Sequence, residues 1–194
     1  MELRRLCVFC SSSNNLPKAF REEARALGDR MAKEGIELVF GGGSVGLMGV
    51  LADAVLAGGG TVTGVIPSFL ATKELAHEGI TRQVVTRTMH ERKQEMSRLA
   101  DAFAILPGGF GTLDEFFEIL TWKQLGLHDR PIVVANSGGW FTPLREFCRQ
   151  AVSWGAVTRR NVELFSVVPS AMEVLPALHR IRAAAAAPKR LSRT

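Results

Sequence analysis

Residues 102–115 read AFAILPGGFGTLDE, an apolar run that passes through a glycine-rich turn into helix-forming residues. The apolar run at residues 102–106 and the similar PIVVA at residues 131–135 show no alternation with polar residues. Near-continuous apolar strands of this kind are typical of a parallel sheet that is buried on both faces. The sequence therefore predicts strands that are covered by helices on both sides.

The same alternation of strand and helix runs through the rest of the chain. Apolar, mostly β-branched segments predict strands at residues 6–9, 37–40, 61–66, 83–85, 102–106, 132–135 and 164–168. Helical spacing predicts helices at residues 17–33, 46–57, 89–100, 112–125, 142–153 and 171–181. Parallel strands joined by crossover helices form a doubly wound α/β sheet. We predict one Rossmann-like domain at residues 1–183, with a mostly parallel sheet of about seven strands, and a flexible basic tail at residues 184–194.

Composition limits the class of protein. With 194 residues, 46% hydrophobic and 22% charged, the chain has the composition of one globular domain. No apolar run approaches the roughly 20 residues of a membrane span, and the N-terminal segment is less apolar than a signal peptide. Three cysteines, an odd number, fit reduced thiols. We therefore predict a cytoplasmic protein with no membrane partner.

Two patterns that resemble binding motifs have simpler explanations. Cys7 and Cys10 match C-x-x-C, but they fall on a predicted strand, where residues three apart point to opposite faces. A redox pair is therefore not expected, and we predict no metal site. The net charge of +5 comes largely from Lys189, Arg190 and Arg193 in the tail. Because aromatic and basic residues do not alternate, we predict no nucleic-acid partner and a body suited to small anions.

Glycines gather in the loops that follow predicted strands, where ligands bind in folds of this class. These loops read GGGSVGLMG at residues 41–49 and PGGFGT at residues 107–112. Gly41, Gly43 and Gly46 match the dinucleotide pattern GxGxxG, but no acidic residue follows the next strand to bind a ribose. The Gly-Lys-Ser/Thr ending of a P-loop is missing as well. We predict that backbone amides at a helix N-terminus bind phosphate, with no NAD or other cofactor.

Thr112 and Glu115 allow two interpretations. Their T-x-x-E spacing is that of a capping box, with Thr112 as N-cap and Glu115 at the third helical position. A cap, however, does not need the Pro-Gly-Gly-x-Gly that precedes it. The spacing alone leaves both a structural and a functional role open.

Arg92 and Lys93 lie unexpectedly close to an apolar stripe. Both are three or four residues from Met89 and Met96, and this stripe continues with helical spacing to Leu99 and Phe103. A buried unpaired charge is costly, so both cations need anionic partners unless their ends reach water. The alternative to such snorkelling is that both face the glycine-loop end of the sheet.

The motifs PGGFGTLDE, MHERKQEM, GGGSVGLMG and TWKQLGLHDRPI together resemble the Lonely Guy (LOG) family. The resemblance covers about residues 5–180. Members of this family are cytokinin riboside 5′-monophosphate phosphoribohydrolases. The resemblance therefore implies hydrolysis of the N-glycosidic bond of adenosine 5′-monophosphates, including N6-substituted ones. The implied products are the free base and ribose 5-phosphate.

The resemblance also implies roles for particular residues. Arg92 and Glu115 match the catalytic pair of the family. Residues that match substrate-contacting positions are Glu74, Arg92, Lys93, Gly109, Phe110, Gly111, Thr112, Leu113, Asp114, Glu115 and Thr121. Family members commonly have glycine where this chain has Ser11, a difference that concerns base or phosphate specificity.

Two further expectations concern partners and function class. Family members of this length are homodimers, and apolar residues occur on every side of the predicted helix at residues 112–125. A homodimer is therefore expected. A carrier of nucleotide or cofactor on the same fold is the alternative to an enzyme. The pairing of Arg92 with Glu115 favours the enzyme, because a pure phosphate binder gains nothing from a carboxylate beside its anion.

Overall fold

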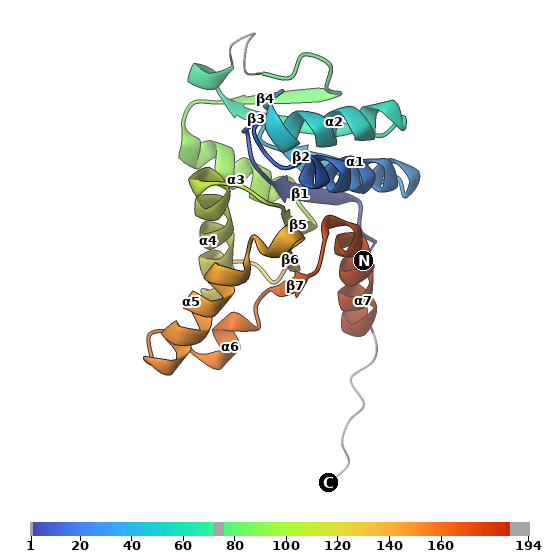
Figure 1. Cartoon of the computed structure of the whole chain (residues 1–194). Helices are drawn as coiled ribbons and strands as arrows, with labels where there is room; N and C mark the ends of the chain where they lie inside the picture. The colour runs from blue at the N-terminus through green and yellow to red at the C-terminus, as the bar shows by residue number, and fades with distance from the viewer. Residues whose placement is uncertain (1, 72–75, 187–194) are drawn as a thin grey trace.

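Seven strands form one sheet in the computed structural model, which describes residues 2–71 and 76–186 (Figure 1). The strands are β1 (Arg5–Phe9), β2 (Glu37–Phe40), β3 (Val62–Pro67), β4 (Arg82–Thr86), β5 (Ala102–Ile105), β6 (Ile132–Ala135) and β7 (Ser166–Val168). Their order across the sheet is β4-β3-β2-β1-β5-β6-β7, and every neighbouring pair is parallel. The predicted doubly wound α/β fold is confirmed.

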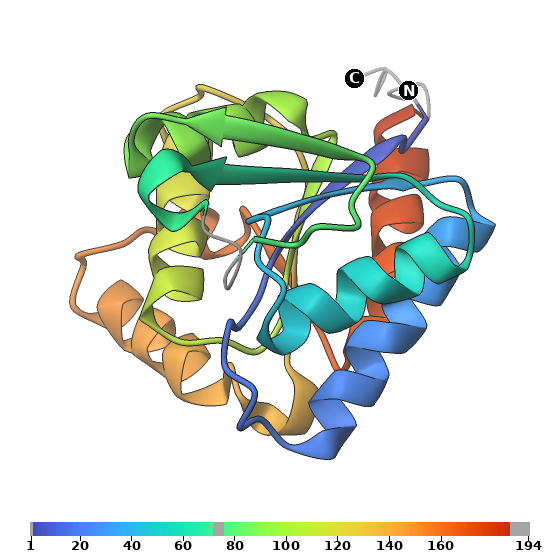
Figure 2. The same cartoon turned by 90° about the horizontal axis from the view of Figure 1, so that it is seen from above.

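Helices cover both faces of the sheet, as Figure 2 shows. The helices are α1 (Lys18–Lys33), α2 (Gly46–Ala57), α3 (Met89–Leu99), α4 (Phe110–Gln124), α5 (Thr142–Ser153), α6 (Arg159–Val162) and α7 (Val174–Ala186). Three short 3-10 turns accompany them: η1 (Ser68–Leu70), η2 (Ser137–Gly139) and η3 (Ala171–Glu173). Residues of α1, α2 and α7 pack in one buried cluster, and residues of α3, α4 and the segment before α5 pack in the other. Within the described residues, no helix is long and apolar enough to cross a membrane.

Several predicted boundaries were wrong. Helix α3 ends at Leu99, one residue before the predicted end, and Phe103 lies in β5, within the strand predicted at residues 102–106, and not on the helical stripe. Helix α4 begins at Phe110, two residues before the predicted start. Helix α7 begins later than predicted and continues to Ala186, past the expected domain boundary, while α6 was not predicted at all. A helix of one turn has too few residues to show a 3.6-residue period.

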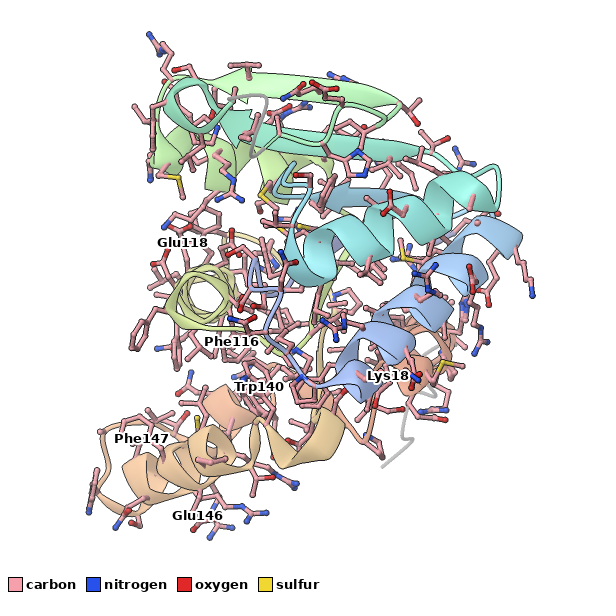
Figure 3. The ribbon with its side chains drawn as sticks, turned by 45° about the horizontal axis from the view of Figure 1, so that its top comes forward. Lys18, Phe116, Glu118, Trp140, Glu146 and Phe147 are labelled. Atoms are coloured by element: carbon pink, nitrogen blue, oxygen red, sulfur yellow. The ribbon has the colours of Figure 1, made fainter. Side chains whose placement is uncertain are left out.

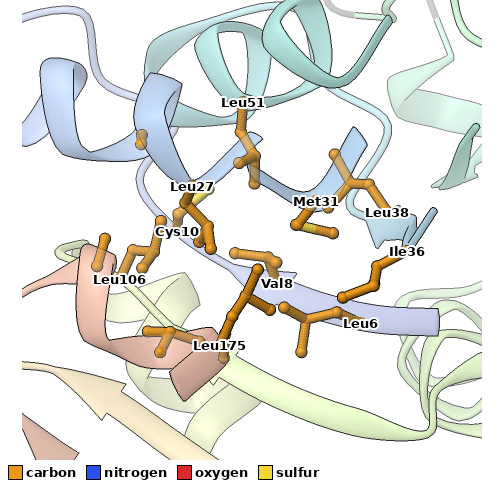
Figure 4. Close-up of a cluster of buried hydrophobic side chains, with 14 of the residues drawn as sticks. Leu6, Val8, Cys10, Leu27, Met31, Ile36, Leu38, Leu51, Leu106 and Leu175 are labelled. Atoms are coloured by element: carbon orange, nitrogen blue, oxygen red, sulfur yellow. The ribbon is translucent and has the colours of Figure 1, made fainter. Parts of the chain in front are cut away.

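The core consists of two layers separated by the sheet. Leu6 and Val8 of β1 point to the side of α1, α2 and α7, in the same buried cluster as Leu27 and Met31 of α1 (Figure 4). The intervening Cys7 and Phe9 point to the side of α3 and α4. Each fully buried leucine or phenylalanine contributes about 1.5–3 kcal/mol relative to an exposed one. Strands β5 and β6 are apolar throughout because both of their faces are buried, and β1 and β2 are apolar after their first residues, Arg5 and Glu37.

The order in which strands are added to the sheet reverses between the parallel neighbours β1 and β5. From β1 the chain builds the sheet outward through β2 and β3, whereas from β5 it builds the other half through β6 and β7. The loops after β1 and β5 therefore leave the sheet edge in different directions, which opens a ligand site there. The two loops meet where the Ser11 amide donates a hydrogen bond to the Pro107 carbonyl over 3.1 Å.

Candidate active site

The N-terminus of α4 presents free backbone amides at this reversal point. Its N-cap is Gly109, which has no side chain that accepts a hydrogen bond. Within residues 2–71 and 76–186, no acceptor is found for the amides of Phe110, Gly111 and Thr112. Unpaired amides at a helix N-terminus, together with the helix dipole, form a binding site for an anion. This arrangement is suited to a phosphate group.

The capping-box interpretation of Thr112 and Glu115 is wrong. Because α4 begins at Phe110, Thr112 is the third residue inside the helix and is buried. Its side chain instead packs on Gly108, where an added Cβ would lie only 2.1 Å from the Thr112 Oγ1. Glycine at position 108 is therefore required for the turn to approach the helix. The T-x-x-E spacing places Thr112 and Glu115 on one face of α4, not around its cap.

The N-terminus of α2, which carries the GxGxxG pattern, is filled by the chain itself. The Gly46 amide donates to Oδ1 of Asn14 over 2.8 Å, and the Leu47 amide donates to the Ser11 carbonyl over 2.9 Å. A Cβ on Gly46 would lie 2.5 Å from the Ser11 carbonyl oxygen. The last glycine of the pattern thus permits packing against the loop after β1. These contacts leave α4 as the better phosphate site.

Arg92 and Glu115 face each other between α3 and α4. Nη1 of Arg92 lies 3.4 Å from Oε1 of Glu115, and both side chains are only 11% exposed. The guanidinium also donates from Nε to the Val65 carbonyl over 3.0 Å and from Nη2 to the Gly41 carbonyl over 3.3 Å. A Cβ on Gly41 would lie 2.0 Å from Nη2, so Arg92 fits only against glycine. The carboxyl ends of β2 and β3 thereby fix the guanidinium that faces Glu115.

Burial gives Glu115 an unusual proton affinity. Desolvation raises the pKa of its carboxyl from 4.5 to about 7, although the nearby charge of Arg92 lowers it. Near neutral pH the group therefore exists both as acid and as base. A carboxyl with a pKa near the working pH is suited to proton transfer or to stabilising a developing cation.

Lys93 has two carboxylate partners on α4. Its Nζ lies 3.1 Å from Oδ2 of Asp114 and 3.1 Å from Oε1 of Glu118. Burial opposes protonation, but hydrogen bonds to both carboxylates raise the pKa of Lys93. Figure 3 shows Glu118 on the side of α4 that faces α3, while Phe116 points into the core. Sequence reasoning missed Glu118. Its position three residues after Glu115 places it on the same face of α4, which was the signal that could have found it.

The structure brings most of the predicted residues together. Arg92 pairs with Glu115 and Lys93 pairs with Asp114 across the seam between α3 and α4. Gly109 to Leu113 form the start of α4 just before these carboxylates, and Phe110 is 93% exposed there. Thr121 is exposed on α4, nine residues after Thr112, which is about 13 Å farther along the helix. Glu74 lies outside the described residues.

Known proteins resemble this chain along most of its length. Cytokinin riboside 5′-monophosphate phosphoribohydrolase LOG2 of Arabidopsis thaliana is 42% identical over 175 residues, which cover 90% of this chain and 82% of LOG2. The chain belongs to the LOG family. The probable phosphoribohydrolase LOGL9 of Oryza sativa is 44% identical over 168 residues, covering 87% of this chain and 74% of that protein. A family model described as possible lysine decarboxylase matches residues 48–178.

Solved structures share the fold of this LOG-family chain at lower sequence identity. The molybdenum cofactor carrier protein of Chlamydomonas reinhardtii has a TM-score of 0.71 and 21% identity, over 94% of this chain and 99% of the carrier. The molybdenum cofactor binding protein of Rippkaea orientalis has a TM-score of 0.70 and 18% identity, again over 94% and 99%. At these identities the likeness concerns the fold alone.

Proposed function

We propose that this chain hydrolyses the N-glycosidic bond of adenosine 5′-monophosphates, including N6-substituted ones. The products are the free base and ribose 5-phosphate. The observation that carries the proposal is the row of free amides at the start of α4 beside a buried carboxyl with a pKa of about 7. The proposal agrees with the names of the curated relatives, which are cytokinin riboside 5′-monophosphate phosphoribohydrolases.

The spacing along α4 suits the two ends of the reaction. The amides of Gly111 and Thr112 receive the 5′-phosphate, and Glu115 follows three residues later, about 4.5 Å along the helix axis. Cleavage of a glycosidic bond passes through a state that resembles an oxocarbenium ion. The ionised Glu115 stabilises this cation or activates the water that attacks the anomeric carbon. The departing base leaves with the bonding electron pair and takes up a proton.

The two cations have different roles in this proposal. Arg92 is engaged with Glu115 and two backbone carbonyls, so it orients the carboxylate and favours its ionised form. Lys93 is shared between Asp114 and Glu118. Two of the three N–H donors of its ammonium are thus engaged with carboxylates, which leaves at most one for a substrate phosphate. The amides of α4 are consequently the main phosphate ligands.

We expect base release to require the 5′-phosphate. Compared with AMP, adenosine should lose about 100-fold or more in kcat/KM, because phosphate binding energy is used at the reacting centre. Free adenine is measured with both substrates, and ribose 5-phosphate, but not ribose, should inhibit the reaction. Equal turnover of adenosine and AMP would contradict the proposal.

A carrier that binds nucleotide or cofactor without turnover is the second candidate. Molybdenum cofactor carriers share the fold at 18–21% identity, which is evidence about the fold and not about activity. The position of Glu115 argues against a carrier. A buried carboxyl beside a phosphate site weakens anion binding, and only a chemical role of the carboxyl explains why it is there. Incubation with AMP separates the two candidates: a carrier retains intact AMP, whereas the enzyme releases adenine.

We propose that the enzyme is a cytoplasmic, single-domain protein whose body extends to the end of α7 at Ala186, three residues past the predicted end at residue 183. The three cysteines Cys7, Cys10 and Cys148 are free thiols, as a reducing compartment favours. Cys7 and Cys10 lie in the two different core layers, so they are structural residues and not a redox pair.

We further propose that two copies form a homodimer through the outer face of α4. Phe110 is 93% exposed and Phe117 is 38% exposed on this helix, while Phe147 on α5 is 55% exposed. Such exposed aromatic residues are typical of protein interfaces. Light scattering at micromolar concentration should give twice the 21.1 kDa of one chain. Phe117→Glu should shift the mass to that of a monomer, and a wild-type mass near that of one chain would refute the dimer.

A further inference from the structure

The indole of Trp140 is hydrogen-bonded to the turn that precedes α4. Its Nε1 donates to the Gly108 carbonyl over 3.0 Å, in a part-buried setting and across 32 residues of sequence. Trp140 follows η2, in the segment after the carboxyl end of β6, and β6 is the neighbour of β5 in the sheet. The contact therefore joins the second half of the sheet to the start of α4.

The turn before α4, which Trp140 contacts, is held by few other contacts. Gly108 and Gly109 are consecutive, and glycine has more backbone freedom than any other residue. An added Cβ on Gly109 would contact nothing within 4 Å, so side-chain packing does not confine this position. Two carbonyls of the turn are held from outside: that of Pro107 by the Ser11 amide over 3.1 Å, and that of Gly108 by Trp140.

Holding the Gly108 carbonyl also orients the next amide. The carbonyl of Gly108 and the N–H of Gly109 belong to one planar trans peptide unit, so they point in opposite directions. An indole that fixes the carbonyl on one side thus fixes the N–H on the other. The amides of Phe110 and Gly111 follow directly, and their directions depend on the same turn.

Trp140 itself is supported by its surroundings. Its ring lies 5.7 Å from that of Phe141, which packs edge-on against Phe116 of α4 at 5.5 Å. The Phe141 amide donates to Oδ1 of Asn136 over 2.7 Å, which fixes the backbone beside the indole. The donor is consequently held by the same aromatic cluster that seats α4.

We propose that Trp140 is a positioning residue for phosphate binding, which acts by fixing the Gly108–Gly109 peptide at the start of α4. This inference rests on the proposed function only in taking the α4 amides as the phosphate site. It assigns to Trp140 no contact with substrate. Its effect should fall on ligands that carry a phosphate and not on the nucleoside.

The decisive variant is Trp140→Phe. Phenylalanine keeps an aromatic ring beside Phe141 but has no donor for the Gly108 carbonyl. Because loss of one hydrogen bond costs about 0.5–1.5 kcal/mol, KM for AMP should rise roughly two- to twelvefold. The inhibition constant for ribose 5-phosphate should rise by the same factor, while that for adenosine stays unchanged. Trp154→Phe, at an exposed residue that follows α5, is the matched control and should leave all three constants unchanged.

A second measurement does not depend on the folding of that variant. The chain has three tryptophans, so the combined change Trp122→Phe and Trp154→Phe leaves Trp140 as the sole indole. Titration with ribose 5-phosphate should then change the indole emission in a saturable way, whereas adenosine should not.

Each outcome decides the inference. Unchanged constants for AMP and ribose 5-phosphate in Trp140→Phe would overturn it, as would equal weakening of adenosine binding, which indicates general disruption. An indole emission that is insensitive to ribose 5-phosphate would also overturn it. A wild-type protein that binds ribose 5-phosphate but releases no base from AMP would refute the proposed function and leave this inference intact.

Discussion

Glu115→Gln should lower kcat for adenine release from AMP by about 100-fold or more while the fold survives. The side chain is buried, lies 3.4 Å from the Arg92 guanidinium and has no capping role in α4. Glutamine has nearly the same shape, but it cannot hold the negative charge that stabilises the oxocarbenium-like state. Initial rates of base release from AMP at neutral pH measure the effect.

The matched control is Glu118→Gln, the same change three residues later on the same helix. Glu118 pairs with Lys93 and not with Arg92, so its loss should cost far less turnover than the loss of Glu115. Normal turnover and an unchanged melting temperature in Glu115→Gln would show that Glu115 has no role in catalysis. Equal loss in both variants would instead assign the effect to the general charge of the α3–α4 seam.

The pH dependence of stability provides an independent check on Glu115. Its pKa in the folded protein, about 7, lies above the ordinary value of 4.5, so the folded state binds the proton more tightly than the unfolded state does. The wild type should therefore lose stability as pH rises from about 4.5 to about 7. Glu115→Gln has no carboxyl to titrate and does not lose this stability. The melting temperature of the variant minus that of the wild type should therefore increase from about pH 4.5 to about pH 7. A constant difference would show that the pKa of Glu115 is ordinary.

Most of the fold follows from local sequence. Strands β5 and β6 are recognisable because residues buried on both faces leave an unbroken apolar run, and the 3.6-residue period marks the longer helices. The order of the strands depends on contacts between distant segments, and no local pattern contains it. The helical spacing that links Phe103 to Met96 and Leu99 is a coincidence, because Phe103 lies in β5, within the strand predicted at residues 102–106.

The site was only partly predictable from the residues. The glycines and the two cations indicated an anion site, but T-x-x-E spacing is the same for a cap and for one face of a helix. The start of α4 at Phe110, with Gly109 as its N-cap, and the contact of Thr112 with Gly108 distinguish them. The backbone partners of Arg92 at Val65 and Gly41 come from other strands, so their positions follow from the folded sheet. The indole of Trp140 lies 32 residues from its acceptor and has no sequence motif.

Arg92→Lys should lower kcat at least tenfold although the positive charge is retained. The guanidinium uses three nitrogens in three directions: Nη1 faces Glu115, Nε donates to the Val65 carbonyl and Nη2 donates to the Gly41 carbonyl. An ammonium is a single point of charge and cannot keep this planar arrangement. A lysine at position 92 would therefore either leave the Val65 or the Gly41 carbonyl unpaired or fail to face Glu115. Arg92→Ala should be more severe, because it also leaves Glu115 without its counter-charge.

Lys93→Arg, on the adjacent residue, is the matched control and should be tolerated better. Lys93 meets two carboxylates, Asp114 and Glu118, and a guanidinium fork can pair with both. The two side chains project about 100° apart around α3, so one cannot substitute for the other. Steady-state kinetics on the three variants give the order of their kcat values. Near-normal turnover in Arg92→Lys together with inactive Lys93→Arg would reverse the assignment and make Lys93 the cation on which catalysis depends.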